Sequence, residues 1–215
     1  HRTALLRTGT MAITAATTGV SGPAGAGKSS MAVCLARDRA IQAHFSDGVT
    51  WLPFGRERTG AEVLATLAAR LGVAAVPGIE PTVAISRALA GQRRLLVLDD
   101  VWTAEQLSAF EALTANGGLL GLLVTTRNDD LAGEHAQKVD ALEGGEELRV
   151  LAAYIGGDTT AQSLLDNGDA RELVKMCSGN PAMLRSVAAL CKKKGAAPTL
   201  AYLEQCRQKL NLPKS

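Results

Sequence analysis

The stretch TTGVSGPAGAGKSSMAVCL, residues 17–35, decides the fold. Small, β-favouring residues lead into a loop with three glycines, and the loop leads into an apolar segment with helical spacing. The positions from Gly22 to Ser29 fit the spacing G-x-x-x-x-G-K-[ST], which is typical of the phosphate-binding loop between a strand and a helix. We therefore predict a strand at 17–21, a nucleotide-binding loop, and a helix that begins near Lys28.

Each residue type in this loop has a role in binding phosphate. Glycines allow successive backbone N–H groups to turn inward around phosphate oxygens, Lys28 would reach the β and γ phosphates, and the Ser29 hydroxyl would ligate Mg²⁺. The positive N-terminal end of the following helix adds to the attraction. The alternative is an ordinary glycine-rich turn. The predicted nucleotide-binding residues of the loop are Gly22, Pro23, Ala24, Gly25, Ala26, Gly27, Lys28, Ser29 and Ser30.

Composition limits the class of protein. With 215 residues, 47% of them apolar, the chain is long enough for one α/β domain and a small helical one. A formal charge of +2 gives no reason to expect a nucleic acid or a membrane as partner. The chain has no apolar run of about 18 residues and no signal-peptide pattern, which predicts a soluble, cytoplasmic protein. The four cysteines form no metal-binding spacing, so we expect buried, reduced thiols.

Strand patterns alternate with helix patterns up to residue 143. Two of the helices open with capping-box patterns, at Thr59 and at Thr103, and a short helix is expected at DLAGEH (130–135). This alternation predicts an α/β fold, a P-loop NTPase with a five-stranded parallel sheet. Besides 17–21, strands are expected at GVTWLPF (48–54), RRLLVLDD (93–100), GGLLGLLVTTR (117–127) and QKVDAL (137–142).

The alternation stops near residue 144. Only helical patterns follow, separated by GDTT, DNGD, SGNP and KGAAP, and we expect about four short helices in a bundle. The predicted domains are an α/β nucleotide-binding domain at 1–143 and a helical bundle at 144–215. We interpret the lysines of CKKKG (191–195) as the last turn of a helix before its C-cap rather than as a basic patch.

Charged side chains follow two of the expected strands. Asp99 and Asp100 end LLVLDD, at the edge where ligands of parallel sheets bind. Asp99 is the candidate for holding Mg²⁺, and Asp100 for positioning or deprotonating the attacking water. Arg127 ends LLVTTR, where a cation would neutralise charge on the γ phosphate and tell ATP from ADP. The alternatives are a helix N-cap for the two acids and a surface residue for Arg127.

Five motifs, in order, resemble the NB-ARC nucleotide-binding domain, a STAND-type P-loop NTPase domain. They are GPAGAGKSS, FSDGVTWLPFG, LLVLDDVW, LLVTTR and CSGNPAML, and the resemblance covers residues 12–210. The family includes plant disease-resistance proteins, the animal apoptosome ATPase and the nematode cell-death ATPase. The abrupt ends of the chain lead us to expect a fragment of a larger protein.

The resemblance implies a role for each matching residue. Residues 22–30 would hold the phosphates, Asp99 the metal, Asp100 the hydrolytic water, and Arg127 would sense the γ phosphate. The same resemblance places the strand that precedes Arg127 between the phosphate-loop strand and the strand of the two acids.

The resemblance also extends into the helical part of the chain. GNPA (179–182) matches the G-L-P-L motif of the family, and Pro181 would pack near adenine. Asn180 and Ala182 replace the two leucines of that motif, which loosens the expected packing. We expect the winged-helix domain of the family, whose histidine contacts ADP, to lie outside this chain.

The function that the resemblance implies is a switch in apoptosis or innate defence. It would be a slow ATPase with ATP or ADP and Mg²⁺ as cofactors, whose ATP form allows oligomerisation and signalling. Its partners would be the nucleotide, other copies of the chain and other domains of the full protein. Two alternatives stay open: a scaffold that holds nucleotide without hydrolysing it, and a small-molecule P-loop kinase, which the lack of an Arg-rich lid segment after Arg127 disfavours.

Overall fold

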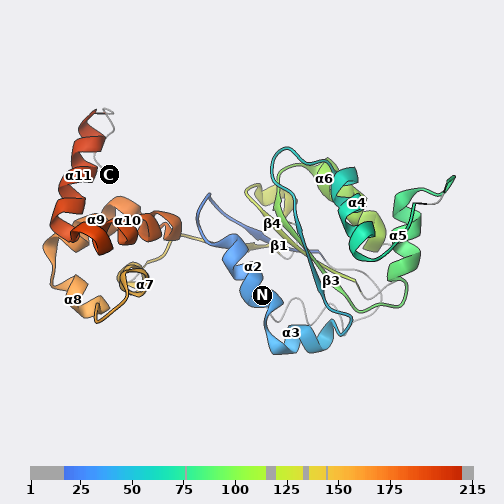
Figure 1. Cartoon of the computed structure of the whole chain (residues 1–215), viewed down its shortest axis with the longest axis horizontal. Helices are drawn as coiled ribbons and strands as arrows, with labels where there is room; N and C mark the ends of the chain where they lie inside the picture. The colour runs from blue at the N-terminus through green and yellow to red at the C-terminus, as the bar shows by residue number, and fades with distance from the viewer. Residues whose placement is uncertain (1–16, 76, 115–119, 133–135, 144, 210–215) are drawn as a thin grey trace. The chain divides into compact units, whose positions relative to one another are not determined.

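The chain forms two compact units (Figure 1). The computed structural model describes residues 17–75, 77–114, 120–132, 136–143 and 145–209. The first unit comprises the residues up to Ala24 and Lys28–Val139, and the second comprises Gly25–Gly27 and the residues from Asp140 onward. The domain ranges expected from the sequence, 1–143 and 144–215, stay a prediction.

A parallel sheet forms the centre of the first unit. In the described part of the chain it has five strands, in the order β2-β3-β4-β1-β5, and each neighbouring pair runs parallel. The α/β fold with a five-stranded parallel sheet is therefore confirmed, and β4 does lie between β1 and β3. The strands are β1 (Thr17–Ser21), β2 (Val49–Pro53), β3 (Leu95–Val101), β4 (Gly121–Thr126) and β5 (Gln137–Lys138).

Helices cover both faces of this sheet (Figure 1). The helices α4 (Gly60–Arg70), α5 (Pro81–Leu89) and α6 (Ala104–Thr114) share one apolar core with the sheet. A second core packs α2 (Lys28–Ala36) and α3 (Arg39–His44) against it. Strand β3 supplies both cores, because Leu96 and Leu98 belong to the first and Leu95 and Val97 to the second. All four side chains are fully buried, which explains why this part of the sequence is an uninterrupted apolar run.

Local capping patterns fixed several helix ends as expected. Thr59 and Glu62 form the predicted capping box of α4. Thr103 and Gln106 exchange the same two bonds ahead of α6, each at 3.3 Å. The sequence patterns did not predict α3, a six-residue helix that Asp38 caps by accepting two backbone N–H groups.

The expected helix at 130–135 differs from the structure. The described residues form a short 3₁₀ helix, η1 (Asp129–Leu131), and the end of DLAGEH lies outside the described residues. None of the helices in the described ranges is both long and apolar enough to cross a membrane.

The second unit is a helical bundle with its own apolar core. Five helices lie in its described part, rather than about four, because the four polar separators divide the segment into five pieces. Lys192, Lys193 and Lys194 do form the last turn of a helix, which ends at Gly195. The helices are α7 (Glu146–Ile155), α8 (Ala161–Leu165), α9 (Gly168–Cys177), α10 (Pro181–Lys194) and α11 (Ala196–Lys209).

The four cysteines are free thiols in different surroundings. Cys177 and Cys191 are buried in the core of the second unit, as expected. Cys34, in contrast, is exposed on α2, and Cys206 is half-buried. The expectation of buried thiols is therefore wrong for Cys34.

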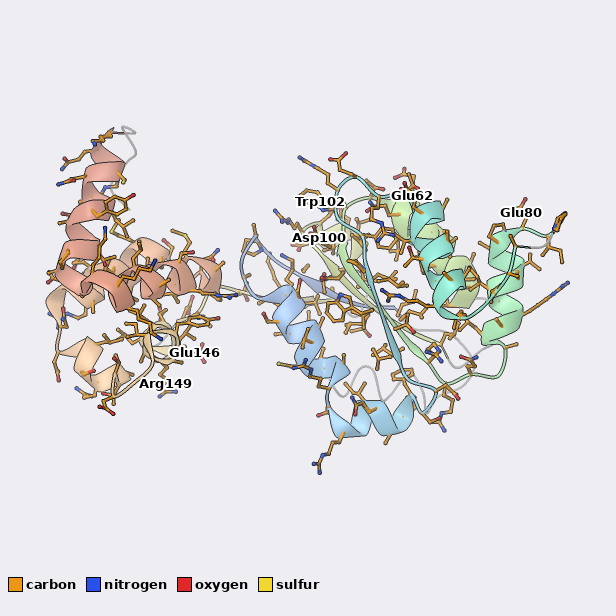
Figure 2. All side chains as sticks on the ribbon, viewed as in Figure 1. Glu62, Glu80, Asp100, Trp102, Glu146 and Arg149 are labelled. Atoms are coloured by element: carbon orange, nitrogen blue, oxygen red, sulfur yellow. The ribbon has the colours of Figure 1, made fainter. Side chains whose placement is uncertain are left out.

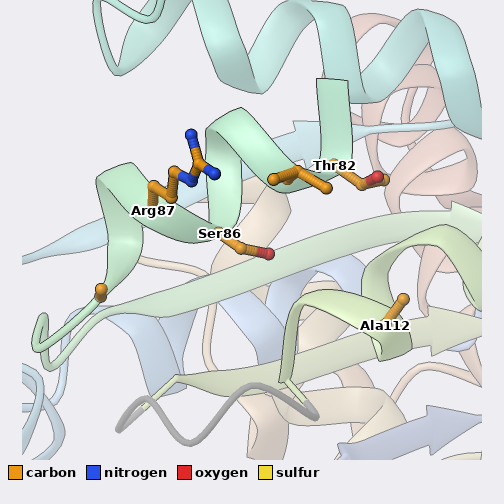
Figure 3. A pocket seen from close by; sticks show the side chains of 6 residues that line it. Thr82, Ser86, Arg87 and Ala112 are labelled. Carbon is orange, nitrogen blue, oxygen red and sulfur yellow. The ribbon is translucent and has the colours of Figure 1, made fainter. Parts of the chain in front are cut away.

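A groove of about 420 Å³ lies between α5 and α6 in the first unit (Figure 3). Among the described residues, its lining comes from α5, the residue that follows α5, and α6, and none of it comes from the ends of the strands. The groove is therefore separate from the edge where the sequence places a nucleotide. The lining residues are Thr82, Val83, Ser86, Arg87, Ala90 and Ala112.

Candidate nucleotide-binding site

The loop between β1 and α2 needs its glycines. Gly22, Gly25 and Gly27 have φ angles of +140°, +77° and +101°, a region that residues with a Cβ rarely adopt. At Gly22, a Cβ would also lie 2.4 Å from the backbone oxygen of Val139. The strand before the loop and the helix after it are both present, so the structural context of a phosphate-binding loop is met.

Lys28 is enclosed by its own loop. Its Nζ donates to the carbonyls of Gly22 and Pro23, both at 2.8 Å, and the residue is only 8% exposed. Burial, followed by the positive charge of Arg127, lowers the pKa of Lys28, whereas Asp100 and Asp99 act in the opposite direction. The ammonium group is thus held at the loop within reach of the two acids and the arginine.

Asp99 joins three elements of the first unit. Its Oδ1 accepts the hydroxyl of Ser29, at the start of α2, at 2.7 Å, and that of Thr125, in β4, at 2.6 Å. Hydroxyl and carboxylate oxygens are ligands that Mg²⁺ accepts, so Ser29 and Asp99 fit the ion. No group of three or more His, Cys, Asp or Glu in the described ranges could hold a metal alone. Phosphate and water would therefore supply the other ligands.

A β-bulge presents the two acids. Leu98 pairs with Val124 and Val101 with Thr126, so Asp99 and Asp100 together stand opposite the single residue Thr125. Asp100 has a φ angle of +60°, which is uncommon for a residue other than glycine. Bulges of this kind redirect side chains at the edges of sheets.

Two backbone contacts hold Asp100 in this conformation. Its N–H donates to the Thr125 hydroxyl at 2.8 Å, and its carbonyl accepts the N–H of Gly55 at 3.1 Å. Thr125 is 1% exposed and bonds both acids, yet the sequence analysis did not identify it. In the sequence, Thr125 shows only as a hydroxyl residue just before the end of a buried strand.

Arg127 faces Asp100. The Nε atom lies 3.6 Å from Oδ1 of Asp100, and the two side chains are 44% and 38% exposed. The structure thus brings Lys28, Ser29 and Arg127 to the two acids at the carboxyl edge of the sheet. Pro181 belongs to the second unit, where it is the first residue of α10.

Comparisons with known proteins fit this arrangement. A family model described as the NB-ARC domain matches residues 4–154. Apoptotic protease-activating factor 1 of Danio rerio is 31% identical over 210 residues, which is 88% of this chain and 16% of that protein. A probable disease resistance protein of Arabidopsis thaliana is 28% identical over 180 residues, 82% of this chain and 21% of that protein. The chain therefore spans a minor part of the curated relatives that it matches.

A solved structure supports the fold. The structure of Drosophila ORC bound to DNA matches with a TM-score of 0.57 and 12% identity, over 93% of this chain and 56% of that one. At this identity, the likeness concerns the fold alone: a parallel α/β unit of P-loop type followed by helices.

Proposed function

Because the chain belongs to the NB-ARC family, we propose that it is the nucleotide-dependent switch of a larger signalling protein. NB-ARC domains bind nucleotide. In the proposal, ATP and ADP alternate in the site, and slow, Mg²⁺-dependent hydrolysis converts the ATP form into a closed ADP form. The ATP form allows self-association and contact with other domains. The names of the relatives concern apoptosis and disease resistance, and we infer signalling of one of these kinds.

One observation carries the proposal: the hydroxyls of Ser29 and Thr125 both donate to Asp99, and Arg127 pairs with Asp100, so that α2, β3 and β4 are linked at a single edge. Lys28 and Arg127 supply positive charge there, and Ser29 and Asp99 supply oxygen ligands. Such an edge suits a phosphate chain that arrives with its own metal ion. Pro181 completes the proposal as the residue that packs near adenine.

The residues of the edge divide the proposed chemistry among them. Loop N–H groups and Lys28 bind the phosphate oxygens, and Arg127, beside Asp100, pairs with the γ phosphate. Asp100 then orients the water and accepts its proton as the water oxygen bonds to the γ phosphorus. The bond between the γ phosphorus and the leaving oxygen breaks, and ADP and phosphate are released. Mg²⁺, held by Ser29 and Asp99, would neutralise charge on the phosphates.

Separation of ATP from ADP after incubation tests the proposal. The purified 215-residue chain is incubated with labelled ATP and Mg²⁺, with and without candidate phosphate acceptors, beside a Lys28→Ala sample prepared identically. We expect slow formation of ADP and free phosphate by the parent protein and none by Lys28→Ala. Bound ATP that stays intact would favour the scaffold, and transfer to an acceptor would favour the kinase. Equal rates in both samples would point to a contaminating ATPase.

A further inference from the structure

The indole ring of Trp102 contacts two guanidinium groups. The Cζ atoms of Arg56 and Arg127 each lie 4.7 Å from the centroid of the ring. Trp102 directly follows β3, next to the end that carries Asp100 (Figure 2), whereas Arg56 precedes α4 and Arg127 follows β4. A guanidinium within about 6 Å of an aromatic centroid is attracted by the negative face of the ring. The ring therefore binds cations from two other segments of the first unit.

A buried amide fixes the backbone that carries this ring. Gln106, which is 5% exposed, accepts the backbone N–H of Trp102 through Oε1 at 2.7 Å. Its Nε2 donates to the carbonyls of Gly55 and Arg58, at 3.0 and 2.7 Å. Since Arg56 lies between these two residues, one side chain joins its segment to the turn that carries the indole. The backbone that carries the ring is therefore tied through Gln106 to the segment that contains Arg56.

The ion pair with Asp100 by itself holds the Arg127 side chain only weakly. This side chain is 44% exposed, and its ion pair with Asp100 spans 3.6 Å, longer than a direct hydrogen bond. An exposed arginine held in one geometry loses side-chain entropy, so a single exposed ion pair restrains it weakly. The contact with the flat face of the indole is a second interaction on the same guanidinium.

We propose that Trp102 is a positioning residue for Arg127. The ring holds the guanidinium beside Asp100, at the edge where the γ phosphate would enter, and thereby strengthens the preference of the site for ATP over ADP. This inference rests on the proposed function, in which Arg127 senses the γ phosphate. Trp102 itself touches neither the nucleotide nor the water in this proposal.

The ratio of ATP affinity to ADP affinity tests the role of the ring. Fluorescent nucleotides are titrated into the full chain and into Trp102→Leu, which removes the ring, and Trp102→Phe, which keeps an aromatic face. Trp51→Leu is the matched control, because Trp51 is the other tryptophan of the chain, half-buried in β2. Arg127→Ala and its combination with Trp102→Leu show whether the ring acts through the arginine.

We expect Trp102→Leu to lower the ratio about two- to fivefold, as the loss of one exposed cation–π contact would. Trp102→Phe should keep most of the ratio, and Trp51→Leu all of it. In the Arg127→Ala background, Trp102→Leu should change the ratio no further. Equal loss of both affinities, or a change of ratio that persists without Arg127, overturns the inference. A parent protein that binds neither nucleotide overturns the proposed function as well.

A fluorescence measurement keeps the inference testable if Trp102→Leu does not fold. In Trp51→Phe, Trp102 is the only tryptophan and reports on its own surroundings. ATP should change its emission more than ADP does, since only ATP brings a γ phosphate to the guanidinium that stacks on the ring. This difference should vanish when Arg127→Ala is added. An equal response to both nucleotides in Trp51→Phe contradicts the inference.

Discussion

At the scale of single residues, the candidate site carries a balanced set of charges. Lys28 and Arg127 are positive, Asp99 and Asp100 are negative, and each of the other three charges acts on the pKa of Lys28. The negative charge of a triphosphate is therefore not neutralised by the side chains alone. This balance explains why the proposed ligand is a nucleotide with its metal ion, for which Asp99 supplies an oxygen ligand.

Lys28→Ala tests the cation of the loop. Loss of the charged contacts to the phosphates should weaken ATP binding about 10- to 100-fold, as charge-assisted hydrogen bonds of about 1.5–3 kcal/mol imply. Titration with a fluorescent ATP analogue measures this. Lys138→Ala removes an exposed lysine of β5 that pairs with Asp129, and should leave the affinity unchanged. An unchanged affinity in Lys28→Ala would remove this residue from the binding site.

The two acids should have separable effects. Asp100→Asn should keep nucleotide binding and slow hydrolysis, because an amide accepts no proton from water. Asp99→Asn should weaken the Mg²⁺-dependent part of binding, because it removes the charge of the proposed ligand. Binding with and without Mg²⁺, together with ADP release from ATP, distinguishes them. Hydrolysis at the parent rate in both variants would reduce the pair to the N-cap role that the sequence left open.

At the scale of elements, the bulge of β3 decides where the acids point. Thr125 bonds the backbone of one acid and the carboxylate of the other, and the left-handed φ of Asp100 depends on such external contacts. The threonine thus links the shape of β3 to the position of the side chains that follow it.

Thr125→Val should lower the free energy of unfolding. The substitution keeps the shape but leaves the Asp100 N–H without its acceptor, at a cost of about 1–3 kcal/mol. Urea denaturation measures the change. Thr18→Val is the matched control, since Thr18 is fully buried in β1 and its hydroxyl has no partner in the described part of the chain. Thr18→Val should be neutral or stabilising. An equal loss of unfolding free energy in both variants would show that the hydrogen bonds of Thr125 do not stabilise the bulge.

The secondary-structure elements also show which features of the fold and the site could be predicted from the sequence. Lys28 and the two acids follow local patterns, a glycine-rich loop and the end of a buried strand. For Arg127, the family resemblance supplied the strand order that predicts its place at the same edge. Thr125 and Gln106 act through a bulge and through bonds between segments far apart, which no local spacing encodes. The helix α3 is too short to show a helical period of apolar residues. In the second unit, four polar segments separate five helices, so the expected number of about four was one too low.

At the scale of the whole molecule, the two units have separate cores, and that of the second unit contains a buried thiol that responds to pH. Burial, followed by the charge of Cys191, raises the pKa of Cys177 in the second unit from 9.0 to about 11. Between these values the unfolded chain has released this proton and the folded one keeps it. The unfolded state therefore binds fewer protons, and the free energy of unfolding falls as pH rises. The contribution of Cys177 is fully present below pH 9 and is lost as pH approaches about 11.

Cys177→Ala should flatten this dependence. A shift of this size corresponds to about 2–3 kcal/mol between the two pH limits. Urea denaturation at several values across this alkaline range, for the parent and the variant, isolates the thiol because all other groups titrate in both. Cys34→Ala, which removes the exposed thiol of α2, should keep the slope of the parent. A parent slope in Cys177→Ala would assign the alkaline loss to other groups.

The strand order has a consequence for biosynthesis. Thr17 in β1 is in register with Leu122 in β4, so β1 waits for this inner neighbour until most of the described part of the first unit has been translated. At ~5–20 residues per second, that delay is on the order of 5–20 s. Nascent chains stalled before Gly121 should therefore not retain ATP on an affinity resin, although the glycine-rich loop is complete. During those seconds, the nucleotide of the proposed function cannot yet stabilise the early part of the chain.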